Sequence, residues 1–369
     1  MAIDRRRLLA GFGGMAAFMA VPIPARAGGG PLFLSAYATA GGDKPGYGVA
    51  ALDADGGVVF ATALPGRAHA VVPNPVRAQA VVFARRPGRW FVPLDLATGV
   101  AGAPVRVPED RRFTGHGVFS ADGRLLYVAE DDVPREAGAI AVYDVADGYR
   151  RLDAMPTHGI GPHELVALDG VRVLAVANGG VITHPDTGRA KLNLDDMDAS
   201  LTYVEAASGR LLDRARLPEE HANLGIRHLA ALADGSIAFG VQDERPTGAL
   251  QPLVGTHRPG GGPVRLFDMP EDTLARFEGY VGSVATDGRT VAASSPRGGL
   301  VGFWDAPSGR WLGAASLPDG CGIAWADGRC VATSGHGAVA SLAPDGGEAG
   351  ARRASSGLRW DNHLTPMGT

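Results

Sequence analysis

An Asp-Gly dipeptide between alternating apolar segments recurs along the chain and constrains the fold more than any other feature. It occurs at Asp122-Gly123, Asp169-Gly170, Asp234-Gly235, Asp287-Gly288 and Asp327-Gly328. Such a dipeptide is typical of a tight β-hairpin, because the turn requires positive φ values. Further strands that end in an acidic residue, such as Tyr143-Asp144 and Trp304-Asp305, follow hairpins of this kind. A hairpin unit that repeats with additional strands in this way predicts a β-propeller.

The number of blades follows from the strands that would lie nearest the axis. These inner strands are expected to start near His69, His116, His163, His228, Val281, Cys321 and His363. The C-terminal segment from Trp360 supplies only one strand, and the N-terminal segment supplies three, at Leu32–Thr39, Gly48–Asp53 and Val58–Leu64. We therefore predict an all-β, seven-bladed propeller whose last blade is closed by strands from both termini, which removes exposed sheet edges.

The first residues have the pattern of an export signal. Arg5-Arg6-Arg7 precede a weakly apolar segment, Leu8 to Val21, and Ala25-Arg26-Ala27 offers small residues for signal peptidase. Paired arginines before a weakly apolar segment favour the twin-arginine (Tat) route over general secretion. We predict a Tat signal peptide over residues 1–27 and a single propeller domain over residues 28–369. The mature chain would then be periplasmic, without a membrane span.

Composition and known motifs exclude several function classes. A formal net charge of −4 argues against a nucleic-acid partner. Gly-x-Ser-x-Gly, His-Glu-x-x-His and phosphate-binding loop patterns do not occur, so the familiar hydrolase and nucleotide motifs are missing. We expect a monomer.

The two cysteines lie on opposite arms of one predicted hairpin. Cys330 should face about Trp325, and Cys321 should face about Ser334. This offset exceeds what a disulfide can bridge, so both are expected to be free thiols.

Histidine recurs at one position of the repeat. His116, His163 and His228 each stand six residues before the Asp of a hairpin turn, and the same offset from Asp327 gives Cys321. His69 and His363 open two further inner strands, so half of the ten histidines occupy equivalent positions on adjacent blades. Inner strands run parallel around the axis, so these residues should form a ring near the funnel mouth. Because imidazole is the commonest metal ligand and thiolate favours soft metals, we predict a metal site. Its ligands would be His69, His116, His163, His228, His363 and Cys321.

Other polar residues are expected on the same face. Those predicted to bind a cofactor or complete the site are Glu164, Arg297, His336 and Asn362, and Asp361, Glu130 and Asp131 lie near them in the repeat. Two long loops, 178–199 and 243–262, follow second strands and should emerge on this face, where loops often carry function.

A packing role for the histidines is the alternative. In propellers of the WD-repeat type, a Gly-His pair near each inner strand is a packing element, and Gly115-His116 with Trp304-Asp305 has a similar appearance. The spacing from His116 to its Asp-Gly turn is shorter here, and the other histidines lack the preceding glycine. Both interpretations remain open from the sequence.

A family resemblance covers essentially the whole chain. Its marks are Gly115-His116-Gly117-Val118-Phe119-Ser120, Gly161-Pro162-His163-Glu164-Leu165, Ile226-Arg227-His228-Leu229-Ala230, Ser295-Pro296-Arg297-Gly298-Gly299, Cys321-Gly322, Ser334-Gly335-His336-Gly337 and Trp360-Asp361-Asn362-His363. With these segments the chain resembles a Tat-exported bacterial family that is described only as a domain of unknown function. Genes of that family commonly lie beside imelysin-type and di-haem peroxidase-like genes in clusters linked to iron acquisition. The resemblance implies a periplasmic, iron-related role with such proteins as partners, and it assigns no catalytic residue.

Three functions are therefore considered. The first is a periplasmic metal-handling propeller that binds iron or copper at the histidine ring and serves an uptake or redox system linked to iron acquisition. The second is a propeller enzyme, either a lactonase-like hydrolase or an oxidoreductase. The third is a metal-free protein-interaction scaffold. Stoichiometric metal would favour the first, turnover the second, and a metal-free partner complex the third.

Overall fold

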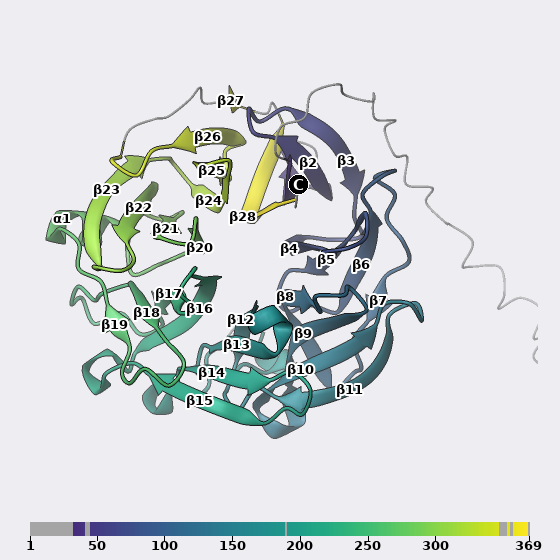
Figure 1. Ribbon diagram of the computed structural model, residues 1–369, viewed down its shortest axis with the longest axis horizontal. Coiled ribbons are helices and arrows are strands. Elements are labelled where there is room, and N and C mark those ends of the chain that lie inside the picture. Colours follow the sequence, from purple (N-terminus) through teal and green to yellow (C-terminus); the bar gives the residue numbers. More distant parts are fainter. Residues whose placement is uncertain (1–31, 41–44, 189, 347–352, 355–356, 368–369) are drawn as a thin grey trace, which may run out of the picture.

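The fold is a ring of seven antiparallel sheets, each with four strands (Figure 1). The computed structural model describes residues 32–40, 45–188, 190–346, 353–354 and 357–367. The predicted seven-bladed propeller is confirmed. The predicted signal peptide, residues 1–27, lies outside the described residues.

The seven innermost strands are neighbours around the axis. They are β4 (Ala68–Pro73), β8 (Arg111–Phe119), β12 (Pro162–Leu168), β16 (Leu224–Ala231), β20 (Ser283–Thr286), β24 (Gly320–Ala326) and β28 (Leu358–Pro366). The second strands are β5 (Gln79–Ala84), β9 (Leu125–Asp132), β13 (Val173–Asn178), β17 (Ile237–Asp243), β21 (Thr290–Ser295), β25 (Arg329–Ser334) and β1 (Leu32–Thr39).

The third and fourth strands complete each blade toward the rim. The third strands are β6 (Trp90–Asp95), β10 (Ala137–Asp144), β14 (Ser200–Glu205), β18 (Val254–His257), β22 (Leu300–Asp305), β26 (Ala338–Leu342) and β2 (Tyr47–Asp53). The fourth strands are β7 (Val105–Arg106), β11 (Arg150–Pro156), β15 (Leu211–Arg216), β19 (Arg265–Leu266), β23 (Arg310–Ser316), β27 (Arg353–Ala354) and β3 (Val58–Ala63). One short α-helix, α1 (Glu271–Arg276), lies between β19 and β20. No helix in the described part of the chain has the length and apolar character needed to span a membrane.

The two ends of the chain close the ring together. The C-terminal strand β28 pairs antiparallel with β1, from Phe33 opposite Pro366 to Thr39 opposite Leu358. The Ser35 hydroxyl also donates a hydrogen bond of 2.9 Å to the backbone oxygen of His363. Figure 1 shows the yellow strand β28 beside the purple N-terminal strands. Ring closure by both termini, as predicted, leaves no blade without its inner strand.

The apolar core lies between the faces of adjacent blades. Phe91 of β6, for example, packs against Phe113 of β8 and Tyr143 of β10 in the next blade. Similar clusters fill the other blade interfaces. Because both faces of each sheet are covered, most strands are buried on both sides, and the blades form a rigid scaffold for residues at the axis.

The acidic residues that end third strands are turn formers. Asp95 accepts hydrogen bonds of 2.8 and 2.9 Å from the backbone amides of Thr98 and Ala97, and Gly99 follows with φ of +70°. These hydrogen bonds lower the pKa of the Asp95 carboxyl. The repeated acidic position therefore has a structural explanation and adds no group to the axis.

Several strand boundaries differ from the sequence prediction. His116, His228 and His363 lie inside β8, β16 and β28, several residues after the strand begins. The loop expected over residues 243–262 is interrupted, because β18 pairs with β17 within that range. The loop after β13 runs to Ser200, as expected.

Both cysteines are free, as predicted, and both are buried. Cys330 lies opposite Trp325, whereas Ser334 lies opposite Gly320 rather than Cys321, because the strand pairing shifts between Gly320 and Ile323.

Candidate metal centre

Irregular pairing of the inner strands positions the five repeated histidines. In the β4–β5 pair the register shifts between Ala68 and Val71, around His69. The same kind of shift surrounds or adjoins the other four histidines, in β8, β12, β16 and β28. A β-bulge turns a side chain away from the alternation of a regular strand. The bulges explain why these rings lie at the axis rather than between blades.

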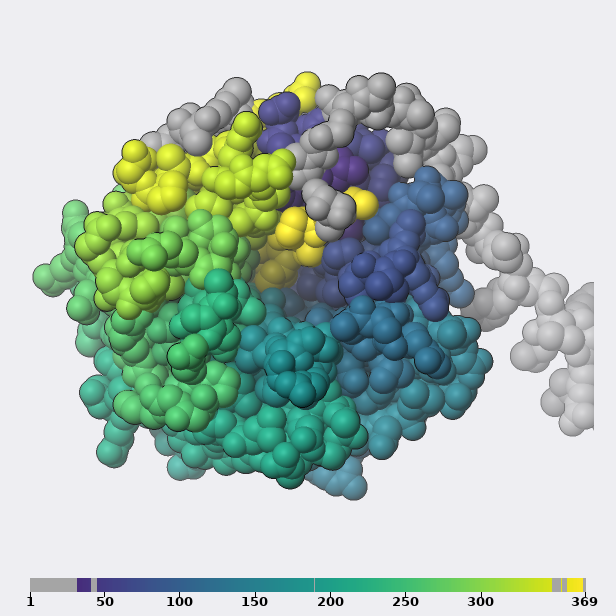
Figure 2. All heavy atoms as spheres, viewed as in Figure 1, coloured from purple at the N-terminus to yellow at the C-terminus, as the bar shows by residue number. Residues whose placement is uncertain are grey.

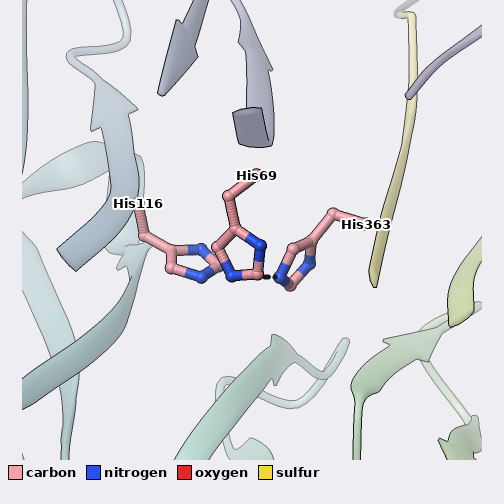
Figure 3. A group of neighbouring side chains, drawn as sticks. All are labelled: His69, His116 and His363. Atoms are coloured by element: carbon pink, nitrogen blue, oxygen red, sulfur yellow. Dashed lines mark hydrogen bonds between the residues drawn. The ribbon is translucent and has the colours of Figure 1, made fainter. Parts of the chain in front are cut away.

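The five imidazoles form one closed cluster. Consecutive ring centroids lie 4.4 Å apart for His363 and His69, and 4.9 Å apart for His69–His116, His116–His163 and His163–His228. His228 returns to His363 at 5.2 Å, although the blades of β20 and β24 lie between theirs. The expected ring of ligands is thus drawn together across the axis. Figure 3 shows His69, His116 and His363 converging from three strands.

A glycine makes room for the contact between His69 and His116. Gly115 precedes His116 and has φ of +106°, and a Cβ atom at this position would lie 2.7 Å from Cδ2 of His69. A side chain at this position would push the His69 ring out of the cluster. Gly115 therefore allows the blades of His69 and His116 to approach each other closely.

Asp361 orients His69 from the outer side of the cluster. Its Oδ1 lies 3.1 Å from His69 Nδ1, and its Oδ2 accepts hydrogen bonds from Arg67 at 2.7 Å and Arg85 at 3.4 Å. Burial opposes ionisation, but the His69 hydrogen bond and the two arginine charges outweigh it and hold the pKa of Asp361 well below its usual range. An ionised Asp361 accepts the Nδ1 proton of His69 and leaves Nε2 facing the other histidines.

Glu164 orients His228 in the way that Asp361 orients His69. Its Oε2 lies 3.2 Å from His228 Nδ1 and accepts a hydrogen bond from the Leu229 amide, and its Oε1 lies 3.7 Å from His116 Nδ1. A carboxylate behind a histidine is the usual arrangement around protein-bound metals, because it fixes the tautomer and raises ligand basicity. Glu164 and Asp361 are therefore supporting residues rather than ligands in this geometry.

Burial favours the neutral form of four of the imidazoles, those of His69, His116, His163 and His363. Burial lowers the pKa of His116, His163 and His363 well below the ordinary value, and the neighbouring histidines lower it further. Burial also lowers the pKa of His69, although the hydrogen bond with Asp361 opposes this effect. Neutral imidazole is the form that binds a metal ion.

Two three-histidine groups have the spacing of a metal site. His69, His116 and His363 form one, and His116, His163 and His228 form the other; in each, the ligand atoms lie within 4.8 Å of one another. Nε2 of His69 and Nε2 of His363 are 3.2 Å apart. Two nitrogens that bind one ion tetrahedrally at ~2.0–2.1 Å are separated by about 3.3 Å. His116 belongs to both groups.

The remaining predicted ligand lies apart from the two groups. The Cys321 thiol donates to the backbone oxygen of Asp319 at 3.1 Å, and burial raises its pKa. Although β24 also has a bulge at Cys321, the structure does not bring its sulfur into either three-histidine group.

The other predicted site residues lie at different depths of the same face. Asn362 is half-buried and lines a cavity beside His69. Arg297 is exposed and covers the Tyr280 ring at 4.3 Å, and His336 is exposed. Arg297 and His336 line an outer hollow together with Cys321 and Asp361. Of the neighbouring acids, Glu130 is fully buried against Arg151, away from the cluster.

A cavity of about 240 Å³ gives access to the cluster. His69, His163 and His228 line it, together with residues from the loop after β13. The same cavity is lined by Arg85, Arg86, Arg112, Lys191 and Arg227, which the sequence analysis did not single out. The sequence held a signal for two of them: Arg227 directly precedes His228, and Arg85 directly follows the second strand of the blade that contains His69.

Comparison with known proteins identifies a family and a fold. A family model described as "Protein of unknown function (DUF1513)" matches residues 47–367. Among solved structures, hydrazine synthase of Kuenenia stuttgartiensis is similar with a TM-score of 0.61 and 15% sequence identity, over 79% of this chain and 89% of that chain. At this identity the likeness shows the propeller fold alone. No curated protein matches the sequence.

Proposed function

The chain belongs to the DUF1513 family of proteins of unknown function, and we propose that it binds a transition-metal ion, iron or copper, at the five-histidine cluster. One observation carries this proposal: two imidazole nitrogens in the cluster, His116 Nε2 and His163 Nδ1, are buried without a hydrogen-bond partner among the described residues.

Unpaired buried nitrogens distinguish a ligand site from a packing site. A buried polar atom without a partner costs about 1–3 kcal/mol, so packing histidines normally use both nitrogens. In this cluster a metal ion would supply the missing partner to nitrogens of His116 and His163. The supporting carboxylates Asp361 and Glu164 favour the same interpretation, because they direct the opposite nitrogens of His69 and His228 inward.

Charge balance also favours a bound cation. Glu164 has histidines as its only ion-pair partners among the described residues. Burial lowers the pKa of His116 and favours its neutral form, so this histidine adds no positive charge beside Glu164. A metal ion in the cluster would provide that charge at short range.

The choice of metal and its biological setting rest on the ligand type and the family resemblance. An all-imidazole set suits iron, copper, zinc and nickel. The resemblance to a family encoded beside iron-acquisition genes favours iron, with copper second. Export through the Tat route fits this role, because a protein that folds before export can take up its metal before it reaches the periplasm.

The experiment measures metal in protein purified without a histidine tag. We expect close to one equivalent of iron or copper per chain in the wild type, since both three-histidine groups share His116. His116→Ala with His163→Ala removes ligands from both groups and should abolish binding. His221→Ala is the matched control, because His221 forms a hydrogen bond with Gln251 and does not belong to the histidine cluster.

Melting curves separate a lost site from a lost fold. Added metal should raise the melting temperature of the wild type and the control but leave that of the double variant unchanged. Unaltered metal content in a double variant with a lowered melting temperature would leave the packing interpretation in place.

A further inference from the structure

The cavity above the histidine cluster has a strong excess of positive charge. It is lined by the five cations Arg85, Arg86, Arg112, Lys191 and Arg227 and by one carboxylate, Glu244. We propose that this cavity binds a small oxyanion chelator, a ligand with at least two carboxylate or phosphate groups. Figure 2 shows that the blades surround a hollow at the centre of the ring on the face in view.

Most of the cations share a few acids. Glu244 accepts from Arg227 Nε at 3.0 Å and lies 2.8 Å from Lys191 Nζ, so one carboxylate holds two cations. Arg85 shares Asp361 with Arg67 and His69, and Arg86 lies 3.4 Å from Asp131. The described acids therefore compensate the cavity charge only in part.

Arg112 is the cavity cation with an unused hydrogen-bond donor. Its Nε atom is buried and has no hydrogen-bond partner among the described residues. Burial lowers the pKa of Arg112, with the charge of Arg89 as the second cause. A buried guanidinium nitrogen without a hydrogen-bond partner is costly, and the planar fork of arginine matches a carboxylate or phosphate group. A bound anion would satisfy this group.

The position of the cations suggests how the ligand would lie. Arg112 and Arg227 line the same cavity as His163 and His228 of the cluster. An anionic group held by Arg112 would leave a second oxygen facing the histidines. This part rests on the proposed function: the oxygen would complete the coordination of the bound ion, and more than one anionic group would engage the several cations.

Two probes and two variants test the proposal. Citrate and inorganic phosphate are titrated calorimetrically into purified wild-type protein, with and without bound metal. We expect binding in both states and tighter binding in the metal-loaded state. Arg112→Gln should lower the affinity for the tighter-binding probe by about tenfold or more, because it removes a charge-assisted pair. Arg77→Gln is the control, since Arg77 is an exposed cation in the turn after β4, at the strand ends opposite the cavity.

The outcomes separate the two proposals. Binding that depends on Arg112 but not on Arg77 supports the anion site, and a preference for citrate or phosphate assigns it to a carboxylate or a phosphate ligand. Arg112-dependent binding to a protein that takes up no metal would reject the metal function and retain the anion site. If metal binds but neither probe does, or if Arg112→Gln binds like the wild type, the anion proposal is overturned.

Discussion

Nε2 of His69 and Nε2 of His363 lie 3.2 Å apart, although 294 positions separate the two residues in the sequence. His69 belongs to the first blade formed entirely by consecutive strands, and His363 belongs to the strand that closes the ring. The three-histidine group of His69, His116 and His363 therefore exists only when the propeller is closed. Closure of the fold assembles this group, whereas His116, His163 and His228 come from three consecutive blades.

Deletion of the residues after Arg359 should remove both ring closure and the three-histidine group of His69, His116 and His363. It takes away most of β28, including Asp361 and His363, and exposes the edge of β1. We expect the melting temperature of the metal-free protein to fall by about 10 °C or more, because the blade loses its inner strand and its packing on two neighbours. Thermal melting by circular dichroism measures this effect. A truncated protein that melts like the intact one would contradict the structural importance of closure.

Asp361→Asn should weaken metal binding while the fold remains. The substitution keeps the shape but removes the carboxylate that accepts from His69 and pairs with Arg67 and Arg85. Loss of such a supporting carboxylate typically lowers metal affinity by about 10–100-fold. Competition with a chromophoric chelator measures the affinity.

The control for this change is Arg67→Gln. Arg67 is half-exposed and contacts Asp361 without touching the histidine ring, so its removal should change metal affinity much less. Equal affinities for Asp361→Asn and wild type would show that Asp361 does not orient His69 for metal binding.

Acid should destabilise the metal-free protein through the histidine cluster. Burial lowers the pKa of His69, His116, His163 and His363 in the folded state, so the unfolded chain binds more protons below the ordinary histidine pKa of about 6.5. The stability that these neutral histidines contribute is therefore fully present above that pH. It is lost as the pH falls from about 6.5 toward their lowered pKa values in the folded state. Metal affinity should decline in the same direction, because protons compete for the imidazoles.

Melting temperatures at pH 7.5 and pH 5.5 test this linkage. The metal-free wild type should lose more stability between the two conditions than His116→Gln with His163→Gln, which lacks two of the titrating groups. Parallel losses in both proteins would assign the acid sensitivity to other residues.

The sequence alone determined the blade count, the closure and the repeated histidines. Asp-Gly turns and acidic strand ends are local features, since they depend on φ angles and hydrogen bonds within a few residues of one another. Spacing to those turns marks His116, His163 and His228, and His69 and His363 were recognised from their place in two further inner strands. For these reasons the fold and the identity of the five histidines were predictable without coordinates.

Only the tertiary structure decided what the histidines do at the axis. Register shifts depend on how β4, β8, β12, β16 and β28 pair with their partners, and this pairing is not encoded in the spacing of His69 or His363. The contact of His228 with His363 and the support from Glu164 and Asp361 join residues from separate blades. Arg112 likewise reaches the cavity from a position that no motif marks. Long-range packing, which sets the direction and burial of each side chain, converted an expected open ring into a compact cluster beneath a cationic cavity.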